Sequence, residues 1–460
     1  MIHRYSMKGL NFLLDVNSGA VHVLDDVSYA VSEFLTPDMS DACPAELMDK
    51  LPQYSSEEIR GAYRELLELK KAGQLFADDD YIDVSKYIPV GAPVKALCLH
   101  VAHDCNLRCK YCFASTGDFG TGRKIMPFEV AKSAIDFVIA RSGKRRNIEV
   151  DFFGGEPLMA FDTVKKTVDY ARSIEAEHGK KFRFTITTNG VLLDEEARRY
   201  INENMDNVVL SLDGRPSVND EMRKTVNGQG SYDVIVPKFR ELVKERDPAR
   251  DYYARGTFTS KNLDFAEDVV HIADAGFDRL SVEPVTSEEG SGYDLTEADL
   301  PKIFAEYERL ADIMEQRRAE GKPFSFFHFM VDLEQGPCVV KRLRGCGAGY
   351  EYVAVTPEGD IYPCHQFVGR PDYRQGSVLD GSFDMEIAKK FAGMNIYTRN
   401  KCKDCWAKFY CSGGCSAAND SMNHDLNEPY ALGCELERKR LECAIYLKAA
   451  EKCSADSSSR

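Results

Sequence analysis

Three cysteines in the first third of the chain are spaced as ligands of one metal centre. Cys105, Cys109 and Cys112 follow the pattern C-x3-C-x2-C. Three thiolates on one tight loop can hold three irons of a 4Fe-4S cluster and leave the fourth iron without a protein ligand. The alternative is a structural zinc site, which needs four closed ligands, and the nearby fourth candidate is His103. The spacing predicts a catalytic 4Fe-4S cluster with one open iron.

A second group of cysteines lies in the last quarter of the chain. Seven thiolates exceed the needs of one zinc ion, and thiolates in such number suit iron-sulfur centres. A zinc ribbon would account only for the C-x2-C piece of the pattern. A second metal region is therefore predicted, and its ligands are Cys346, Cys364, Cys402, Cys405, Cys411, Cys415 and Cys434.

Polar motifs follow three of the predicted strands. They are Gly154-Gly155-Glu156-Pro157, Thr188-Asn189-Gly190 and Ser211-Leu212-Asp213-Gly214. Glycine lets the backbone approach a ligand, and a carboxylate offsets an ammonium charge, although Gly-Gly-Glu alone is also an ordinary turn. Strand ends of a parallel barrel meet at one rim, so we expect these motifs to surround the first cysteine group. Three further residues either line the same cavity or form ordinary salt bridges: Arg223, Arg255 and Glu283.

The elements expected to position these residues form an α/β domain at 95–300. Alternating short apolar strands and amphipathic helices are typical of parallel βα units. Each predicted strand except the last is followed by such a helix, which predicts a partial (β/α)6 barrel. The strands are expected at 95–101, 148–153, 182–187, 207–212, 252–259 and 279–284.

The remaining segments are expected to form separate units. At 11–24 two apolar runs flank Asn17-Ser18-Gly19, which predicts a hairpin, because Asn and Gly tolerate the positive φ of tight turns. Three helices are expected after it, at about 26–35, 44–52 and 56–73, so 1–85 is predicted to be winged-helix-like. Residues 301–345 are expected to form a bridging helical segment, with helix through 301–335. Residues 346–453 are expected to form a cysteine-rich domain closed by a helix at about 434–452.

The composition limits the classes of partner. A net charge of -15 disfavours binding to nucleic acid or to an anionic membrane, because both are polyanions, and favours a substrate with basic residues. No apolar run reaches the roughly 18 residues that span a bilayer, and residues 1–5 lack the apolar stretch of a secretory signal. We expect a cytoplasmic protein whose cysteines stay reduced and serve as metal ligands.

The first cysteine loop, with Tyr111 directly before its third cysteine, resembles the signature of the radical S-adenosylmethionine (SAM) superfamily. The resemblance implies that SAM chelates the open iron and receives an electron into its sulfonium. It also implies that Tyr111 lies beside the adenine and that Ser211 contacts the ribose. The SAM amino group is expected at Gly154, Gly155 and Glu156, and Asn189 and Asp213 are further SAM-binding candidates.

The second cysteine group resembles the SPASM domain, which holds two auxiliary 4Fe-4S clusters, so three clusters are implied in all. The last spacing, Cys415 to Cys434, is one residue longer than the family commonly shows. By resemblance the outer cluster is bound by Cys402, Cys405, Cys411 and Cys434, and the inner one by Cys346, Cys364 and Cys415. Cys338 is either the fourth inner ligand or leaves an open iron for a substrate thiolate.

The whole chain resembles the maturases of SCIFF peptides (six cysteines in forty-five residues), which install thioether bridges. The segment Leu14-Asp15-Val16-Asn17-Ser18-Gly19-Ala20-Val21-His22-Val23 is close to what that family shows. The resemblance implies that 1–85 binds the leader of a ribosomally made Cys-rich precursor peptide as an added edge strand. It also implies that a 5'-deoxyadenosyl radical removes a hydrogen from an acceptor residue, whose carbon is then attacked by a Cys thiolate.

Two alternatives remain open at this point. A sulfatase-maturase-like enzyme would oxidise a Cys or Ser side chain in a protein substrate and needs no leader-binding module. A non-catalytic iron-sulfur protein would only bind a Cys-rich peptide. The thioether-forming enzyme and the sulfatase-maturase-like enzyme would both require a cytosolic electron donor. Neither would need nucleic acid or a membrane as a partner.

Overall fold

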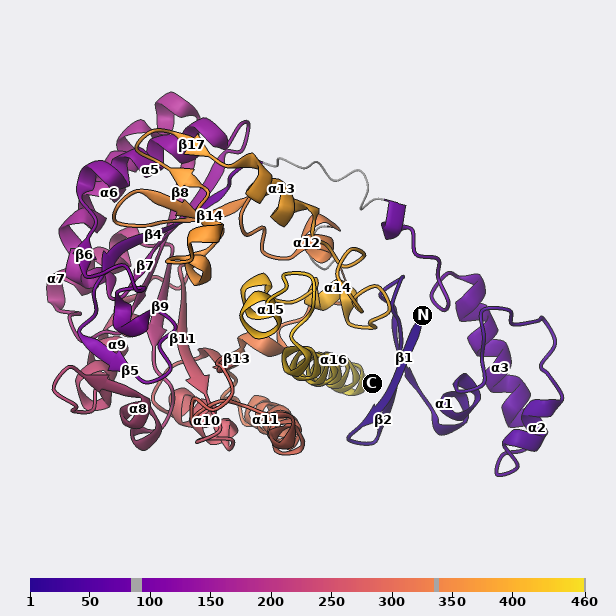
Figure 1. The fold of residues 1–460 in the computed structure, drawn as a ribbon. Helices are drawn as coiled ribbons and strands as arrows, with labels where there is room; N and C mark the ends of the chain where they lie inside the picture. Colours follow the sequence, from indigo (N-terminus) through magenta and orange to yellow (C-terminus); the bar gives the residue numbers. More distant parts are fainter. Residues whose placement is uncertain (84–92, 335–338, 459–460) are drawn as a thin grey trace.

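The computed structural model describes residues 1–83, 93–334 and 339–458, and its largest feature is a mixed twelve-stranded sheet. Figure 1 shows the parallel strands with helices on their outer side, the cysteine-rich segment beside them, and the N-terminal residues beyond it. The strand order is β13-β12-β11-β9-β8-β7-β4-β14-β15-β16-β17, and β6 pairs with β4 outside this path. In the described parts of the chain, no helix has both the length and the apolar character to cross a bilayer.

Six parallel strands form the partial barrel where the sequence predicts it. Each strand buries apolar side chains, and the helices that follow cover its outer face, so the predicted α/β fold is confirmed. The strands are β4 (Ala96–His103), β7 (Asn147–Gly154), β8 (Lys181–Thr188), β9 (Asn207–Ser211), β11 (Asp251–Phe258) and β12 (Arg279–Pro284). The helices are α5 (Phe128–Arg141), α6 (Phe161–His178), α7 (Glu195–Asn204), α8 (Pro216–Met222), α9 (Tyr232–Glu245) and α10 (Phe265–Asp274).

Short elements decorate the ends of this barrel. A two-stranded sheet joins the first cysteine loop to the segment after α8, because β5 (Leu107–Cys109) pairs antiparallel with β10 (Arg223–Thr225). This pairing fixes one side of the loop independently of any ligand. The other short elements are β6 (Lys124–Ile125) and the 3-10 helices η1 (Ser115–Gly117) and η2 (Pro157–Ala160).

The expected bridging helical segment at 301–345 is only partly helical. Helix α11 (Leu300–Ala319) follows β12, and a seventh short parallel strand, β13 (Ser325–Phe326), then pairs with β12. The prediction of helix as far as residue 335 was therefore wrong. Gly321 has a φ of 72°, a conformation that is common where helices end. The helix prediction passed over this glycine because apolar residues follow it. Elements η3 (Glu297–Asp299), η4 (Phe327–Phe329) and α12 (Val339–Arg344) complete this region.

The cysteine-rich region is joined to the barrel by its first strand. Strand β14 (Tyr352–Val355) lies parallel to β4 and extends the barrel sheet. Three short strands follow: β15 (Asp360–Tyr362), β16 (Gly376–Ser377) and β17 (Ser382–Phe383). They pair antiparallel, so one continuous sheet changes from parallel to antiparallel pairing. Its helices are η5 (His365–Phe367), η6 (Pro371–Tyr373), α13 (Met385–Gly393), α14 (Lys408–Cys411), α15 (Ser416–Asn423) and α16 (Ala431–Ser458).

The N-terminal residues form a three-stranded sheet with three helices. The predicted hairpin is present, and the strand before it, which the sequence did not predict, completes the order β1-β2-β3. Helix α3 begins at a capping box in which Ser55 and Glu58 satisfy each other's backbone N–H groups. The elements are β1 (Ile2–Met7), β2 (Leu10–Asp15), β3 (Val21–Leu24), α1 (Asp26–Ser32), α2 (Glu46–Lys50) and α3 (Ser56–Lys71).

Both faces of the central strand β2 are buried. Leu13 packs among the helices of its own domain, whereas Phe12 and Leu14 belong to the core that includes α16. Alternate residues of a strand point to opposite faces, so β2 joins two cores. At the same interface the His3 ring stacks on Trp406 with centroids 3.8 Å apart. The N-terminal domain is thus packed firmly against the cysteine-rich region (Figure 1).

Candidate active site

A cavity of about 240 Å³ lies at the carboxyl ends of the parallel strands. Residues from widely separated parts of the sequence meet in its wall, as the strand-end rule predicts. We call it the barrel cavity. Its wall includes Cys105, Cys109, Tyr111, Cys112, Gly154, Gly155, Glu156, Asn189, Ser211, Arg223, Arg255 and Glu283.

The first cysteine loop is pressed against the strand ends at glycine positions. A Cβ on Gly155 would lie 2.1 Å from the Asp104 carbonyl oxygen, and one on Gly117 would lie 2.7 Å from the Cys105 Cβ. Only glycine allows such an approach. On the opposite side the Asn189 amide donates to Asn106 Oδ1 at 2.7 Å. The loop is therefore held in place by the protein itself.

The thiols of this loop fit an iron-sulfur cluster. Cys105, Cys109 and Cys112 are free, and all three line the barrel cavity. A zinc ion with bonds of about 2.3 Å would draw its sulfur ligands to within about 4 Å of each other. Among the described residues, no three Cys, His, Asp or Glu side chains converge as ligands of one ion. Three free thiols in one cavity wall fit the three protein ligands of a 4Fe-4S cluster that keeps one open iron.

Burial strongly disfavours free thiolates in this loop. It raises the pKa of Cys105 to about 12, and the nearby Glu156 carboxylate adds to this effect. It also raises the pKa of Cys109 to about 11, which Arg223 partly offsets. Metal ligation requires the deprotonated thiol, so these thiolates need a cationic centre to neutralise them.

Glu156 is a buried acid held by donors from two strand ends. Its carboxylate accepts hydrogen bonds from Thr188 Oγ1 and the Asn189 N–H, both at 2.8 Å, and from the Leu158 N–H at 3.0 Å. Burial raises its pKa to about 7. A carboxylate can accept about four hydrogen bonds, so one further donor can be accommodated. A ligand ammonium group suits that position.

Asp213 does not line the barrel cavity, although the resemblance made it a SAM-binding candidate. It is fully buried, and its carboxylate accepts the Tyr111 hydroxyl at 2.7 Å. It also pairs with Arg223 Nε at 3.0 Å and accepts the Thr257 N–H at 3.0 Å. Tyr111 and Arg223 do line the cavity. We therefore assign Asp213 a positioning role behind the wall.

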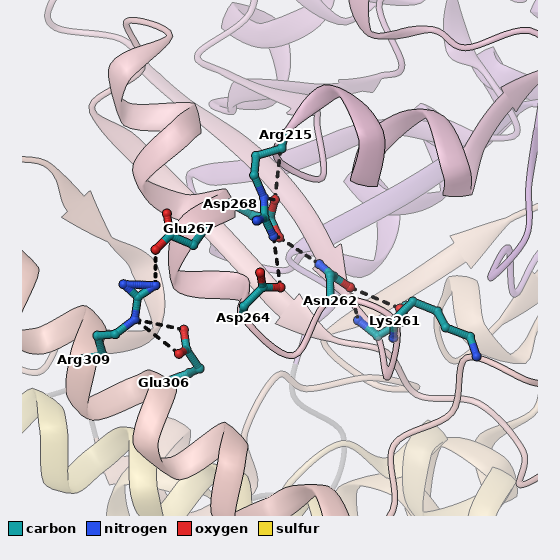
Figure 2. A network of polar contacts seen from close by, with 9 residues as sticks. Arg215, Lys261, Asn262, Asp264, Glu267, Asp268, Glu306 and Arg309 are labelled. Carbon is teal, nitrogen blue, oxygen red and sulfur yellow. Dashed lines mark hydrogen bonds and ion pairs between the residues drawn. The ribbon is translucent and has the colours of Figure 1, made fainter.

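A second polar network anchors the chain just after Asp213 (Figure 2). Arg215 donates from its backbone and its guanidinium to the fully buried Asp268 carboxylate of α10, at 3.0 and 2.8 Å. Gly214 has a φ of +146°, and a Cβ there would lie 2.3 Å from the Asp268 Cβ. The end of β9 is thus clamped to α10, which fixes the position of Asp213.

The predicted outer cysteines lie around one cavity. Cys402, Cys405, Cys411 and Cys434 all line a space of about 230 Å³, which we call the outer cavity. These are the four residues that the resemblance assigns to the outer cluster. Their common cavity suits a 4Fe-4S centre with four thiolate ligands.

Cys364, one of the predicted inner ligands, directly precedes His365, which lines the barrel cavity. Burial raises the pKa of Cys364 to about 12, and the neighbouring Cys415 and Cys346 thiols raise it further. The three predicted inner ligands are therefore close enough to influence one another electrostatically. Cys338, the candidate for a fourth inner ligand, lies outside the described residues.

A middle cavity connects the two regions. It has a volume of about 320 Å³ and is lined by Cys411, Cys415 and Cys434. Residues 283–286, at and just after the end of β12, belong to its wall and also to that of the barrel cavity. The barrel site and the SPASM cysteines therefore share a wall.

Sequence reasoning missed His365 as a residue of the site. It follows Cys364 directly, lines the barrel cavity and lies within hydrogen-bond distance of the Tyr352 hydroxyl, at 3.3 Å. Burial lowers its pKa to about 4. Its adjacency to a cysteine was the available signal. Its place in the barrel follows from the β4–β14 pairing, which the sequence does not reveal.

Both expectations for Arg255 and Glu283, a place in the cavity wall and an ordinary salt bridge, are met. Their side chains form a salt bridge at 2.6 Å, and both residues line the barrel cavity. The neighbouring Arg255 guanidinium holds the pKa of Glu283 below its ordinary value against the effect of burial, which raises it. This pair is a fixed charged element of the wall.

Comparison with known proteins agrees with this arrangement. Residues 99–247 match the radical SAM superfamily, and residues 346–406 match SPASM, an iron-sulfur cluster-binding domain. A cysteine-type anaerobic sulfatase-maturating enzyme of Clostridium novyi is 24% identical over 329 residues, which are 68% of this chain and 85% of that one.

Two solved structures share the fold. The structure of anSMEcpe with bound AdoMet and Kp18Cys peptide has a TM-score of 0.64 and 22% identity, covering 78% of this chain and 99% of that one. Streptococcus suis SuiB bound to the precursor peptide SuiA has a TM-score of 0.53 and 18% identity, covering 94% and 98%.

The fold and the cysteine-lined cavities define an iron-sulfur α/β protein whose partial barrel continues into a cysteine-rich domain. The matched domains identify it more closely. Residues 99–247 form a radical SAM domain and residues 346–406 a C-terminal SPASM domain, and these domains imply SAM and 4Fe-4S clusters as cofactors.

Proposed function

We propose that this enzyme installs an intramolecular thioether crosslink between a cysteine sulfur and a carbon in a ribosomally made, Cys-rich precursor peptide. The observation that carries the proposal is the shared wall of the barrel and middle cavities, at residues 283–286. A radical formed in the barrel cavity and a thiolate bound near the SPASM cysteines would act on one peptide from adjacent sites.

Three 4Fe-4S clusters fit this proposal: one on Cys105, Cys109 and Cys112, an outer one on Cys402, Cys405, Cys411 and Cys434, and an inner one on Cys346, Cys364 and Cys415. When bound, the clusters and SAM supply electron transfer and a 5'-deoxyadenosyl radical. The protein contributes orientation. Glu156 and the neighbouring glycine backbone hold the SAM amino group, and Ser211 and Asn189 contact the rest of the nucleotide.

The reaction balances with a named electron acceptor. The C–H hydrogen of the acceptor residue leaves with 5'-deoxyadenosine, and the cysteine thiol loses its proton. Formation of the carbon–sulfur bond releases one electron, which an auxiliary cluster held by the second cysteine group would accept. The peptide loses two hydrogens for each bridge, and a cytosolic electron donor resets the first cluster.

Features of the N-terminal domain favour a peptide as the substrate. Among the described strands, β3 pairs only with β2, so one of its edges is free to accept an extended chain. A groove of about 360 Å³ between β3 and α3 runs along this edge. We assign this groove to the precursor leader. The SuiB structure, which shares the fold, contains the precursor peptide SuiA.

Mass spectrometry of the precursor tests this proposal. A candidate Cys-rich precursor peptide is incubated without air with the full-length enzyme, SAM and reductant. We expect a loss of two hydrogens per bridge, and cysteines that resist alkylation. An unchanged mass, or an aldehyde at a Cys or Ser position, would contradict thioether formation.

A second candidate is oxidation of a Cys or Ser side chain in a protein, as in a sulfatase maturase. The similarity to the Clostridium novyi maturating enzyme favours it. That reaction needs no leader, so the two candidates differ in whether the β3 groove matters. A non-catalytic peptide-binding protein would yield no 5'-deoxyadenosine.

A further inference from the structure

Among the residues that the structure describes, the groove between β3 and α3 contains one charged group without an ion-pair partner. Its wall consists of Val21, His22, Val23, Leu24, Ser28, Glu65, Leu66 and Leu69. Glu65 is exposed. Within the described residues it forms no ion pair, although most of the acids around it on α3 have one or a cap contact. His22, the other polar ring in the wall, lies 3.1 Å from the Gln74 carbonyl oxygen.

The apolar part of the groove lies one helical turn beyond this acid. Leu66 is buried, and Leu69 is half-buried beside the groove. Glu65 and Leu69 are four residues apart on α3, so they lie on one helix face about 6 Å apart along its axis. The helix thus presents an acidic position and an apolar position in a row.

This spacing matches the side-chain repeat of a strand. Residues i and i+2 of an extended peptide point to the same side and are about 6.6 Å apart. A peptide that pairs with the free edge of β3 would direct alternate side chains towards α3. One of them would meet Leu69 and the next on that face would meet Glu65.

From this match we infer that Glu65 selects a leader segment in which a Lys or Arg lies two positions from a large apolar residue. The inference rests on the proposed role of the domain in leader binding. The occupant is a cationic, extended stretch of the precursor, because the charge in the groove wall is negative. A leader with an acid at that position would be rejected by like-charge repulsion.

The test uses an array of random nine-residue peptides probed with full-length, anaerobically purified enzyme. We expect retained peptides to be enriched about two- to fivefold in the apolar and Lys or Arg pair, the range for an exposed ion pair. Glu65→Lys should replace this preference with one for Asp or Glu. Glu68→Lys, an exposed site on the same helix outside the groove wall, is the matched control and should keep the wild-type preference.

The outcomes distinguish leader selection by Glu65 from the proposed leader binding by the N-terminal domain. If wild type and Glu65→Lys retain peptides with the same cationic preference, Glu65 does not select the leader, and leader binding stands without it. If neither protein retains any class of peptide while both unfold at the same temperature as Glu68→Lys, the proposed recognition role is wrong and the inference goes with it.

Discussion

Asp213 organises the barrel cavity without lining it. Its buried carboxylate links Tyr111 of the first cysteine loop, Arg223 of β10 and the Thr257 backbone of β11. A charged acceptor with two hydrogen-bond donors and an ion pair is worth more than one neutral hydrogen bond, and its loss leaves Arg223 unpaired in a buried position. The wall that faces SAM therefore depends on a residue outside it.

Asp213→Asn should weaken SAM binding. The amide keeps the shape but loses the charge that pairs with Arg223, so Tyr111 and Arg223 are no longer fixed. We expect the Kd for SAM to rise about tenfold, corresponding to about 1.4 kcal/mol. Equilibrium binding to reconstituted enzyme measures it, and an unchanged iron content shows that the cluster loop is intact. Wild-type affinity with full iron content would contradict the positioning role.

Cys402→Ala should separate SAM cleavage from peptide modification. Cys402 lines the outer cavity and not the barrel cavity. The variant should lose the iron of one cluster and still form 5'-deoxyadenosine, while crosslinking falls at least about tenfold, because the electron released at bond formation has no path. Cys43→Ala, in the N-terminal domain and away from these cavities, is the control. Loss of 5'-deoxyadenosine in Cys402→Ala but not in Cys43→Ala would argue against separate sites.

The sequence predicted most of the site residues, but not all of their roles. Cysteine spacing and strand-end motifs located Cys105, Glu156 and Ser211 because each carries a local signal. Asp213 has the same kind of signal, and only its burial shows that it acts through Tyr111. His365 was missed because its place in the barrel depends on contact between distant strands.

At the scale of elements, the contact between the end of β9 and α10 keeps Asp213 in place. Arg215 reaches both Asp264 and Asp268, but the two acids differ in burial: Asp268 is fully buried, and the Asp264 side chain is 46% exposed. A buried partner contributes more than an exposed one, because its removal leaves unpaired groups out of water.

Asp268→Ala should therefore destabilise the enzyme much more than Asp264→Ala. We expect a loss of roughly 3 kcal/mol for the buried acid and less than about 1 kcal/mol for the exposed one. Thermal denaturation of the two variants beside wild type measures the difference. Equal shifts of the Tm would show that the buried pair does not clamp the strand end.

The strands of the barrel could be predicted because each is a short apolar run with a helix behind it. The short strand β13 lies in an apolar stretch that has no amphipathic helix after it, and this stretch was interpreted as part of the preceding helix. The pairing of β14 with β4 was also not predictable, since strands of four residues reveal no partner. It is this pairing that brings the SPASM cysteines to the barrel.

At the scale of the whole molecule, the N-terminal domain is part of the core. Phe12 of β2 lies edge-on to Tyr446 of α16, and the Tyr5 hydroxyl donates to the Glu442 carbonyl oxygen at 3.2 Å. Lys408, buried near the outer cysteines, pairs with Asp79 at 2.7 Å. Removing this domain would uncover apolar side chains of α16 and leave a buried charge unpaired.

Deletion of residues 1–85 should thus destabilise the whole chain rather than abolish leader binding alone. We expect a lower Tm and increased binding of a hydrophobic dye, because the face of α16 that packs on β1 and β2 becomes exposed. Differential scanning fluorimetry and dye titration measure both. Glu65→Lys, which alters only the groove, should match wild type in each. A truncated chain with unchanged Tm would mean that the N-terminal domain does not stabilise the rest of the protein.

The central claim is that Cys105, Cys109 and Cys112 bind an iron-sulfur cluster that splits SAM. The direct measurement is 5'-deoxyadenosine formed by anaerobically reconstituted enzyme with SAM and reductant, together with its metal content. Wild type should contain iron and sulfide and release 5'-deoxyadenosine, and Cys105→Ala should release none while retaining the iron of the SPASM clusters. Zinc in place of iron at this loop, or equal product from Cys105→Ala, would contradict the account.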